Sequence, residues 1–144
     1  MAERKTGSGG VRCVITTPES TVLDTRAQSV SLPLFDGQRG VASGHAPFIG
    51  RLGAGEVRIR GEEGGSADAV RRAFIDGGFV EVGQDVVTII TQRSIPAEKL
   101  DAAAARADLE QMRREPARGA EAIDARMRSE AAARALLRAA ERRG

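Results

Sequence analysis

The chain of 144 residues is poor in the side chains that most enzymes and metalloproteins use. It has one cysteine, Cys13, one histidine, His45, and neither tryptophan nor tyrosine. A single cysteine excludes an internal disulfide and a multi-cysteine metal site. Because Cys13 and His45 stand in unrelated sequence contexts, neither a Ser–His–Asp nor a Cys–His arrangement can be argued. We therefore expect a chain that binds rather than catalyses, without a metal or an obligatory cofactor.

Long apolar runs and a strong excess of one charge are also missing. No apolar run approaches the roughly 18 residues of a membrane-spanning helix, and the amino-terminal MAERKTGSGG lacks the apolar region of a signal peptide. The 22 basic and 20 acidic residues give a net charge of only +2. With mixed charges and few aromatic residues for base stacking, a nucleic-acid partner is not expected. These absences predict a soluble, intracellular protein that does not insert into a bilayer.

Glycine and alanine divide the chain into two parts. Fifteen of the 17 glycines lie at or before Gly83, whereas sixteen of the 48 residues from 97 to 144 are alanine. Short segments separated by glycine are typical of strands and turns, and alanine-rich sequence is typical of helices. We predict a flexible tail over residues 1–10, a β-sandwich domain over residues 11–95 and a helical hairpin over residues 96–144.

The first part contains short, alternating segments that predict an all-β sandwich. The clearest are VRCVITT, QSVSLPLF, EVRIRG and AVRRAFID. The segment GGFVEVGQDVVTIIT predicts a β-hairpin that turns at Gly83-Gln84-Asp85. Pro33 and Pro47 are expected at bulges, edges or turns, because neither can donate a backbone hydrogen bond.

The second part predicts two helices. Ser94 is a candidate cap and Pro96 a candidate first-turn residue of a helix that ends near Arg114, and a second helix is expected from about Ala120 to Arg142. Two weakly apolar stripes follow from helical spacing: Leu100, Ala104, Ala107 and Gln111, then Ile123, Met127, Ala131 and Arg134. Since alanine buries little apolar area, we expect the hairpin to be held weakly.

The longest glycine-rich loop is the strongest candidate for a binding surface. It reads FDGQRGVASGHAPF and combines Arg39 and His45 with Phe48. Loops on a rigid sheet often carry binding residues. Here we expect His45 to act as a contact or loop-shaping residue, or to be a solvated turn residue.

Several of these segments together resemble the epsilon subunit of bacterial F-type ATP synthases, which is called delta in mitochondria. The family's loop reads approximately G-E-L-G-x-x-P-G-H-A-P, and this chain has GQRGVASGHAP from Gly37 to Pro47. The family's GGFxEV…VVTIL segment is similar to the stretch from Gly77 to Ile90. The order and spacing match from about Val11 to Asp101.

This resemblance implies a ten-stranded β-sandwich in two sheets followed by a helical hairpin. It also implies a central-stalk rotor subunit of a proton-translocating synthase, which binds gamma and the c-ring and couples proton flow to ATP synthesis. The hairpin would extend toward the catalytic alpha/beta head and inhibit ATP hydrolysis. The location implied is the cytoplasmic face of the plasma membrane, as a peripheral subunit. The alternative is a free-standing ligand-binding β-sandwich with a helical dimerisation arm.

The resemblance assigns contacts to two regions. Gln38, Arg39, Ser43 and His45 would face the c-ring, although the family commonly has Glu and Leu where Gln38 and Arg39 stand and Pro where Ser43 stands. A glutamine can hydrogen-bond but cannot form an ion pair, and Arg39 can invert the local charge.

On the hairpin, the resemblance offers contacts with acidic partner surfaces or, as a regulatory ligand, ATP. Some family members bind ATP through an I/L-D-x-x-R-A motif, which is broken here because Ala104 stands where arginine is expected. The basic positions of the second helix are retained. The candidate contact residues are Asp101, Arg106, Arg126, Arg128, Arg134 and Arg138.

Overall fold

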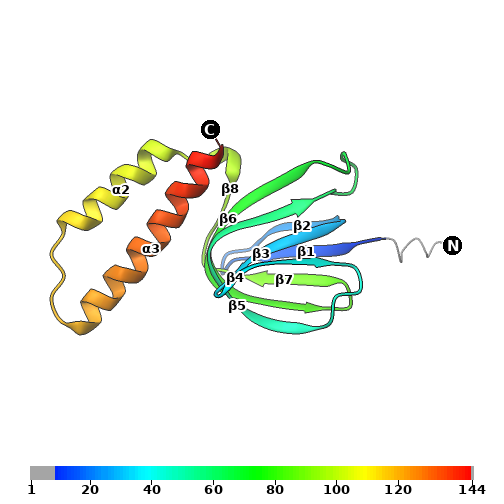
Figure 1. Ribbon diagram of the computed structural model, residues 1–144, viewed down its shortest axis with the longest axis horizontal. Helices are drawn as coiled ribbons and strands as arrows, with labels where there is room; N and C mark the ends of the chain where they lie inside the picture. Colours follow the sequence, from blue (N-terminus) through cyan, green and yellow to red (C-terminus); the bar gives the residue numbers. More distant parts are fainter. Residues whose placement is uncertain (1–8, 144) are drawn as a thin grey trace.

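A computed structural model describes residues 9–143 and contains a β-domain followed by a helical hairpin (Figure 1). The strands are β1 (Val11–Thr16), β2 (Thr21–Ala27), β3 (Ser29–Leu34), β4 (Gly37–Ala42), β5 (Phe48–Arg60), β6 (Val70–Gly83), β7 (Val86–Ile90) and β8 (Ser94–Pro96). A short 3₁₀ turn, η1 (Ala97–Lys99), precedes α2 (Ala102–Arg114) and α3 (Ala120–Arg143). Residues 1–8 of the expected flexible tail lie outside the described residues.

The strands form one continuous hydrogen-bonded sheet that curves around the core. Its order is β2-β1-β7-β6-β5-β3-β4, with β8 added to β6. The predicted sandwich followed by two helices is confirmed, with eight strands in place of ten. The count differs because β5 and β6 are long strands of 13 and 14 residues. Their pairing runs from Phe48–Val82 to Leu52–Gly78 and resumes at Ala54–Asp76, so each strand contributes two segments.

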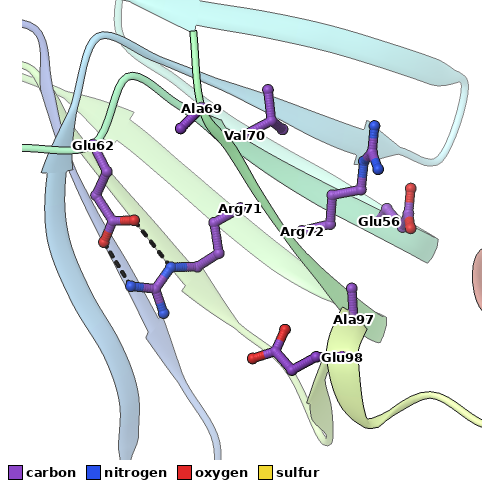
Figure 2. Close-up of a pocket in the computed structure, with 8 residues that line it drawn as sticks. All are labelled: Glu56, Glu62, Ala69, Val70, Arg71, Arg72, Ala97 and Glu98. Carbon is purple, nitrogen blue, oxygen red and sulfur yellow. Dashed lines mark hydrogen bonds and ion pairs between the residues drawn. The ribbon is translucent and has the colours of Figure 1, made fainter. Parts of the chain in front are cut away.

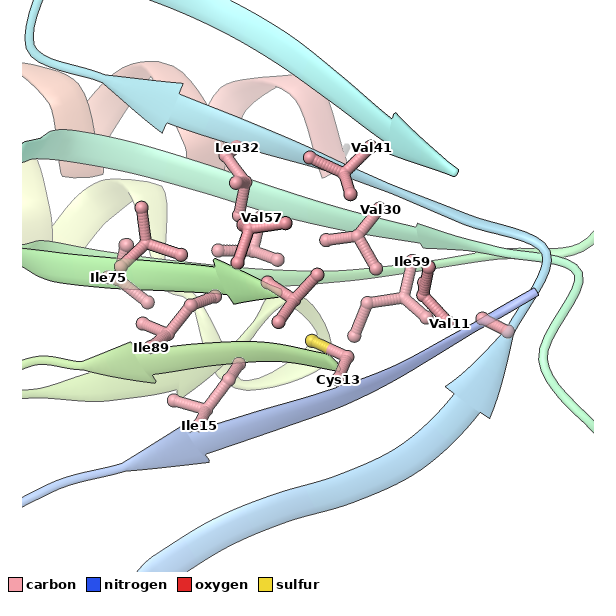
Figure 3. Packing of buried hydrophobic residues seen from close by; sticks show 14 of the residues in the cluster. Val11, Cys13, Ile15, Val30, Leu32, Val41, Val57, Ile59, Ile75 and Ile89 are labelled. Carbon is pink, nitrogen blue, oxygen red and sulfur yellow. The ribbon is translucent and has the colours of Figure 1, made fainter. Parts of the chain in front are cut away.

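The main core lies between the curved layers of the sheet. Figure 3 shows Val11, Cys13 and Ile15 from β1 directed toward side chains from β3, β5, β6 and β7. Cys13 is fully buried, and burial is the chief cause that raises the pKa of its thiol to about 12. Pro33 lies where the register between β3 and β5 shifts, which confirms that it occupies an irregular position.

The first long helix begins later than the sequence predicts. Ser94 and Pro96 belong to β8, which pairs with β6, and Asp101 caps α2 by accepting hydrogen bonds from the backbone N–H groups of Ala103 (3.0 Å) and Ala104 (3.2 Å). Both Ser94–Pro96 and Asp101 can start a helix. The free edge of β6, however, lets Ser94–Pro96 form backbone hydrogen bonds as a strand. Asp101 then caps the helix better than a serine that is followed by extended chain.

The hairpin packs on the outer face of β5 and β6 through a second, smaller cluster. Its buried members are Phe74, Leu100, Ala135, Ala139 and Ala140. Figure 1 shows the carboxyl-terminal part of α3 beside the sheet and the α2–α3 turn far from it. At about 0.8 kcal/mol per buried methylene-sized group, three alanines from α3 contribute little.

The predicted apolar stripes of the helices are wrong except for Leu100, which is buried in the docking cluster but precedes α2. In α2 the buried residues are Ala105 and Leu109, and in α3 Ile123 and Met127 are 46% and 62% exposed. Close approach of α3 to the sheet favours small side chains, so alanines face inward and the larger residues of the first half of α3 face outward.

Candidate functional site

The loop between β4 and β5 is fixed to the neighbouring turn between β6 and β7. The carboxylate of Asp85 accepts hydrogen bonds from Ser43 Oγ (3.0 Å) and from the backbone N–H of Gly44 (2.8 Å). The N–H of His45 donates to the carbonyl of Ala42 at 3.2 Å. These bonds hold the predicted binding loop in one conformation, which lowers the entropy cost of binding a partner.

Asp85 is a functional candidate that the sequence prediction missed. It and Gln84 form the two-residue turn with positive φ angles of 61° and 51°, a conformation for which Asn-Gly is the usual choice. The sequence contained a signal for a special role of Asp85, because Gln-Asp is an unfavourable pair in a turn with two positive φ angles. The structure explains the aspartate at this position, because its carboxylate holds the β4–β5 loop.

His45, Phe48 and Arg39 stack at the base of this loop. The His45 and Phe48 rings lie 5.3 Å apart, and the Arg39 guanidinium lies 5.1 Å from the Phe48 ring centre. His45 Nδ1 is 2.8 Å from the carbonyl of Ala46, to which a protonated Nδ1 donates. These contacts are compatible with the expected loop-shaping role of His45, and Arg39 lies over an aromatic ring without a carboxylate partner among the described residues.

Gln38 differs from its loop neighbours because its side chain already has a partner within the sheet. Its amide Nε2 donates to Ser31 Oγ at 2.7 Å on the adjacent strand. The structure thus brings Arg39, Ser43 and His45 together around one loop and engages Gln38 on β3.

A row of exposed apolar side chains crosses the outer face of the sheet. Phe35, Ile49, Phe79 and Ile90 are 70%, 77%, 58% and 57% exposed. Phe79 pairs with Arg51 on β5 and with Ile90 on β7, and Arg51 stacks over Phe35 at 4.8 Å. We call these four residues the apolar row. Sequence alternation could have found it, because Phe79 and Ile90 are out of phase with the buried residues beside them.

The hairpin residues fall into two groups. Asp101 caps α2, and Arg126 donates to the carbonyl of Glu115 and lies 3.7 Å from Glu130. These contacts are structural in the docked hairpin. Arg128 is exposed on α3.

Three of the predicted hairpin arginines meet at one cleft between α2 and α3. The cleft, of about 400 Å³, is lined by Arg106, Arg113, Arg134 and Arg138 together with Leu109, Glu110 and Leu137. Arg106 is paired with Glu141 at 2.7 Å and Arg134 with Glu130 at 3.4 Å, whereas Arg138 has no ion pair among the described residues. The arrangement presents a basic surface that complements an anion or an acidic protein.

A pocket of about 430 Å³ lies between η1 and the loop that joins β5 to β6 (Figure 2). Figure 2 shows Glu62 and Arg71 on one side and Glu56 on the other. Glu62 accepts two hydrogen bonds from Arg71, at 3.0 and 2.8 Å, and one from Thr25 at 2.7 Å. The Arg71 bonds are the chief cause that lowers the pKa of Glu62. The strongest charges here are paired with one another, so the pocket is not assigned a ligand.

No helix within residues 9–143 is both long enough and apolar enough to cross a membrane.

Comparisons with known proteins agree on one family. The family described as ATP synthase, Delta/Epsilon chain, beta-sandwich domain matches residues 10–97. The ATP synthase epsilon chain of Rhodopirellula baltica is 48% identical over 91 residues, which cover 63% of this chain and 67% of the relative. That of Solibacter usitatus is 37% identical over 123 residues, covering 81% and 88%.

Solved structures extend the likeness to the hairpin. A chain of the Euglena gracilis mitochondrial ATP synthase, in a structure of OSCP, F1 and c-ring, matches with a TM-score of 0.76 at 22% identity over 91% of this chain and 81% of its own. A chain of the Tetrahymena thermophila central stalk and c-ring matches with a TM-score of 0.68 at 14% identity, covering 90% and 96%. These two show the fold. The family match over residues 10–97 and the sequence relatives establish that the chain belongs to the ATP synthase delta/epsilon chain family.

Proposed function

We propose that the chain is a non-catalytic rotor subunit of a proton-translocating F-type ATP synthase. It joins gamma to the c-ring, couples proton flow to ATP synthesis and lies at the cytoplasmic face of the plasma membrane as a peripheral subunit. The observation that carries the proposal is the loop fixed by Asp85 at one end of a sheet that belongs to this family. A torque-transmitting contact requires such a rigid surface, because a mobile loop yields under load.

The c-ring contact is the β4–β5 loop with Arg39 and His45. Gln38 is engaged with Ser31, so Arg39 supplies the charge that this loop offers a partner. Its stacking on Phe48 fixes the guanidinium before binding. The partner surface on the c-ring is then expected to carry a carboxylate opposite Arg39.

The gamma contact is the apolar row. Four large side chains that are more than half exposed, around a stacked arginine, have the composition of an interface centre rather than of ordinary surface. Partner burial of Phe35, Ile49, Phe79 and Ile90 would remove them from water.

The hairpin is proposed as a brake on ATP hydrolysis. Its thin alanine contact with the sheet suits an element that leaves its docking site, and the cleft with Arg134 and Arg138 suits the acidic surface of a catalytic head. ATP itself is a weaker second ligand for this cleft, because Asp101 is used as a helix cap and Arg106 is paired with Glu141.

Titration of the cognate catalytic head, gamma and isolated c-ring with the full chain tests these contacts separately. Replacing Phe79 and Ile90 together by serine is expected to weaken gamma binding about tenfold or more. The control is Val70→Ser, which removes an exposed apolar side chain at the other end of β6. For the c-ring, Arg39→Glu is expected to weaken binding more than Arg39→Gln.

ATP hydrolysis measured in the same titration tests the brake. The wild-type chain is expected to slow hydrolysis, and the double variant Arg134→Ala, Arg138→Ala is expected to bind gamma normally but slow hydrolysis less. If all chains bind and none inhibits, the brake is refuted and the coupling role stands. If the wild type binds neither gamma nor c-ring but associates with itself, the free-standing module with a dimerisation arm replaces the rotor proposal.

A further inference from the structure

One charged side chain in the described part of the molecule is buried. Glu56 is 4% exposed, and the other buried polar residues are the uncharged Thr17 and Thr91. A buried carboxylate is expensive unless cations compensate it, so its partners and the surface it occupies indicate what it does.

The compensating cations come from two different elements. Arg142 of α3 approaches Glu56 Oε1 with Nη2 at 3.2 Å and Nε at 3.4 Å. Arg58, two residues along β5, places Nε 3.6 Å from the same oxygen, too far for a hydrogen bond, and that Nε has no other partner. Arg142 is therefore the better of the two counter-ions.

Glu56 is the only one of these three side chains that is buried as a whole. The side chains of Arg142 and Arg58 are 46% and 42% exposed, whereas that of Glu56 is 3% exposed. The Arg142 guanidinium can therefore return to water at small cost, whereas Arg58 Nε is itself buried without a hydrogen bond. Glu56 cannot return to water while α3 covers it.

Glu56 stands next to the contact between the hairpin and the sheet. It is the direct cross-strand partner of Phe74, which is the largest side chain in the docking cluster. The α3 side of that cluster is made mainly of Ala135, Ala139 and Ala140. Glu56–Arg142 is also the only ion pair between helix and sheet in the described part of the chain.

We propose that Glu56 and Arg142 form a latch that sets the fraction of molecules in which the hairpin is docked. When α3 leaves the sheet, Glu56 becomes hydrated, so the cost of an uncompensated carboxylate falls on the docked state alone. Loss of Arg142 therefore favours release. Loss of both charges removes the penalty, because a buried ion pair replaced by apolar side chains is often neutral or stabilising.

The latch is a property of the isolated chain. Its use as a control of ATP hydrolysis rests on the proposed function. The latch and the proposed control of ATP hydrolysis can consequently be refuted separately.

Amide hydrogen exchange on full-length variants tests the latch. Arg142→Met is expected to speed exchange of the α3 amides near Ala135–Ala140 by about tenfold or more, since unpairing a buried charge is strongly destabilising. Exchange in β1 and β7 should stay unchanged, which shows that the sheet remains folded. Arg138→Met is the matched control, because Arg138 lies one turn away on the same helix and has no ion pair within residues 9–143.

The double variant Glu56→Met, Arg142→Met decides between a latch and a general loss of packing. The latch predicts that α3 exchange returns to the wild-type rate or falls below it. Equal exchange in Arg142→Met and wild type overturns the proposal, and so does a double variant that exchanges faster than Arg142→Met. A variant whose β1 amides lose protection has lost the sheet, and the same comparison is then made with Arg142→Gln and Glu56→Gln.

Hydrolysis assays with Arg142→Met and with the double variant Glu56→Met, Arg142→Met test the link to the brake. If release precedes inhibition, Arg142→Met inhibits the catalytic head at a lower concentration than wild type, and the double variant inhibits no better than wild type. A wild-type chain that does not inhibit refutes the brake, while the exchange result continues to decide the latch.

Discussion

Gly78 lies where the second half of β6 passes the end of β7. Its φ angle is 116°, and a Cβ at this position would stand 2.0 Å from the carbonyl oxygen of Ile90. Gly78→Ala therefore combines backbone strain with a clash against backbone, and we expect a loss of about 2 kcal/mol or more in the free energy of unfolding, measured with urea. Gly64→Ala is the control, because Gly64 has a φ of 88° with nothing within 4 Å. Equal losses of unfolding free energy in the two variants would mean that backbone strain, and not the clash with Ile90, causes the effect of Gly78→Ala.

At the β6–β7 turn, Asp85→Gly is expected to free the β4–β5 loop. Glycine adopts the positive φ without strain, so the change removes the two hydrogen bonds to Ser43 and Gly44 and leaves the turn intact. Exchange of the Gly44 amide should accelerate about tenfold, and c-ring binding should weaken. The adjacent change Gln84→Gly relaxes the same turn but touches neither loop bond. If Gln84→Gly has the same effect on Gly44, the turn rather than the carboxylate controls the loop.

Among the elements, β2, β6 and the β5–β6 loop are joined through Glu62. Arg71 and Thr25 both donate to its carboxylate, and they lower its pKa in the folded chain. A lowered folded-state pKa contributes stability above the unfolded value of about 4.3, and that stability is lost as the pH falls through the folded value.

Glu62→Gln is therefore expected to lower the urea midpoint at pH 7, with a difference from wild type that shrinks as the pH falls below about 4. Glu63→Gln is the neighbouring control, since Glu63 has no ion pair among the described side chains. A Glu62→Gln difference that is constant from pH 7 to pH 3 would show that the ionised carboxylate is not its source.

The elements themselves were largely predictable from the sequence, but their faces and junctions were not. Period-two alternation located β1 and the β6–β7 hairpin, and the sequence also placed the break between the helices, where Pro116 and Gly119 oppose continuation, because these are local effects. The buried face of α3 depends on how closely the helix approaches β5 and β6. Local spacing therefore selected Ile123 and Met127, whereas the fold buries alanines.

The candidate site was predictable in the same unequal way. The resemblance identified Arg39 and His45, since they lie within the loop motif. Asp85 and Glu56 stand 41 and 86 residues from their respective partners Gly44 and Arg142, and no local pattern joins them. The roles of Asp85 and Glu56 can therefore be recognised only in the folded structure, where these distant segments lie together.

On the scale of the whole molecule, the two hydrophobic clusters divide the chain into parts of unequal stability. The main cluster contains most of the large buried side chains, whereas the second consists of Phe74, Leu100 and three alanines. Cys13 belongs to the main cluster, and it is the sole cysteine of the chain. Its thiol therefore reports opening of the sandwich and does not respond to release of the hairpin.

On titration with urea, the helical circular dichroism signal at about 222 nm is expected to fall before Cys13 becomes reactive toward a disulfide reagent. The buried Cys13 thiol, with its pKa raised to about 12, forms almost no thiolate until the core opens. Labelling of Cys13 should therefore follow the unfolding of the sandwich closely. Arg142→Met should move the first transition to lower urea and leave the second in place. Coincident transitions in the wild type would show instead that the alanine contact couples the hairpin and the sandwich into one cooperative unit. In that case the hairpin could not leave its docking site, as the proposed brake requires, without unfolding the sheet that anchors it.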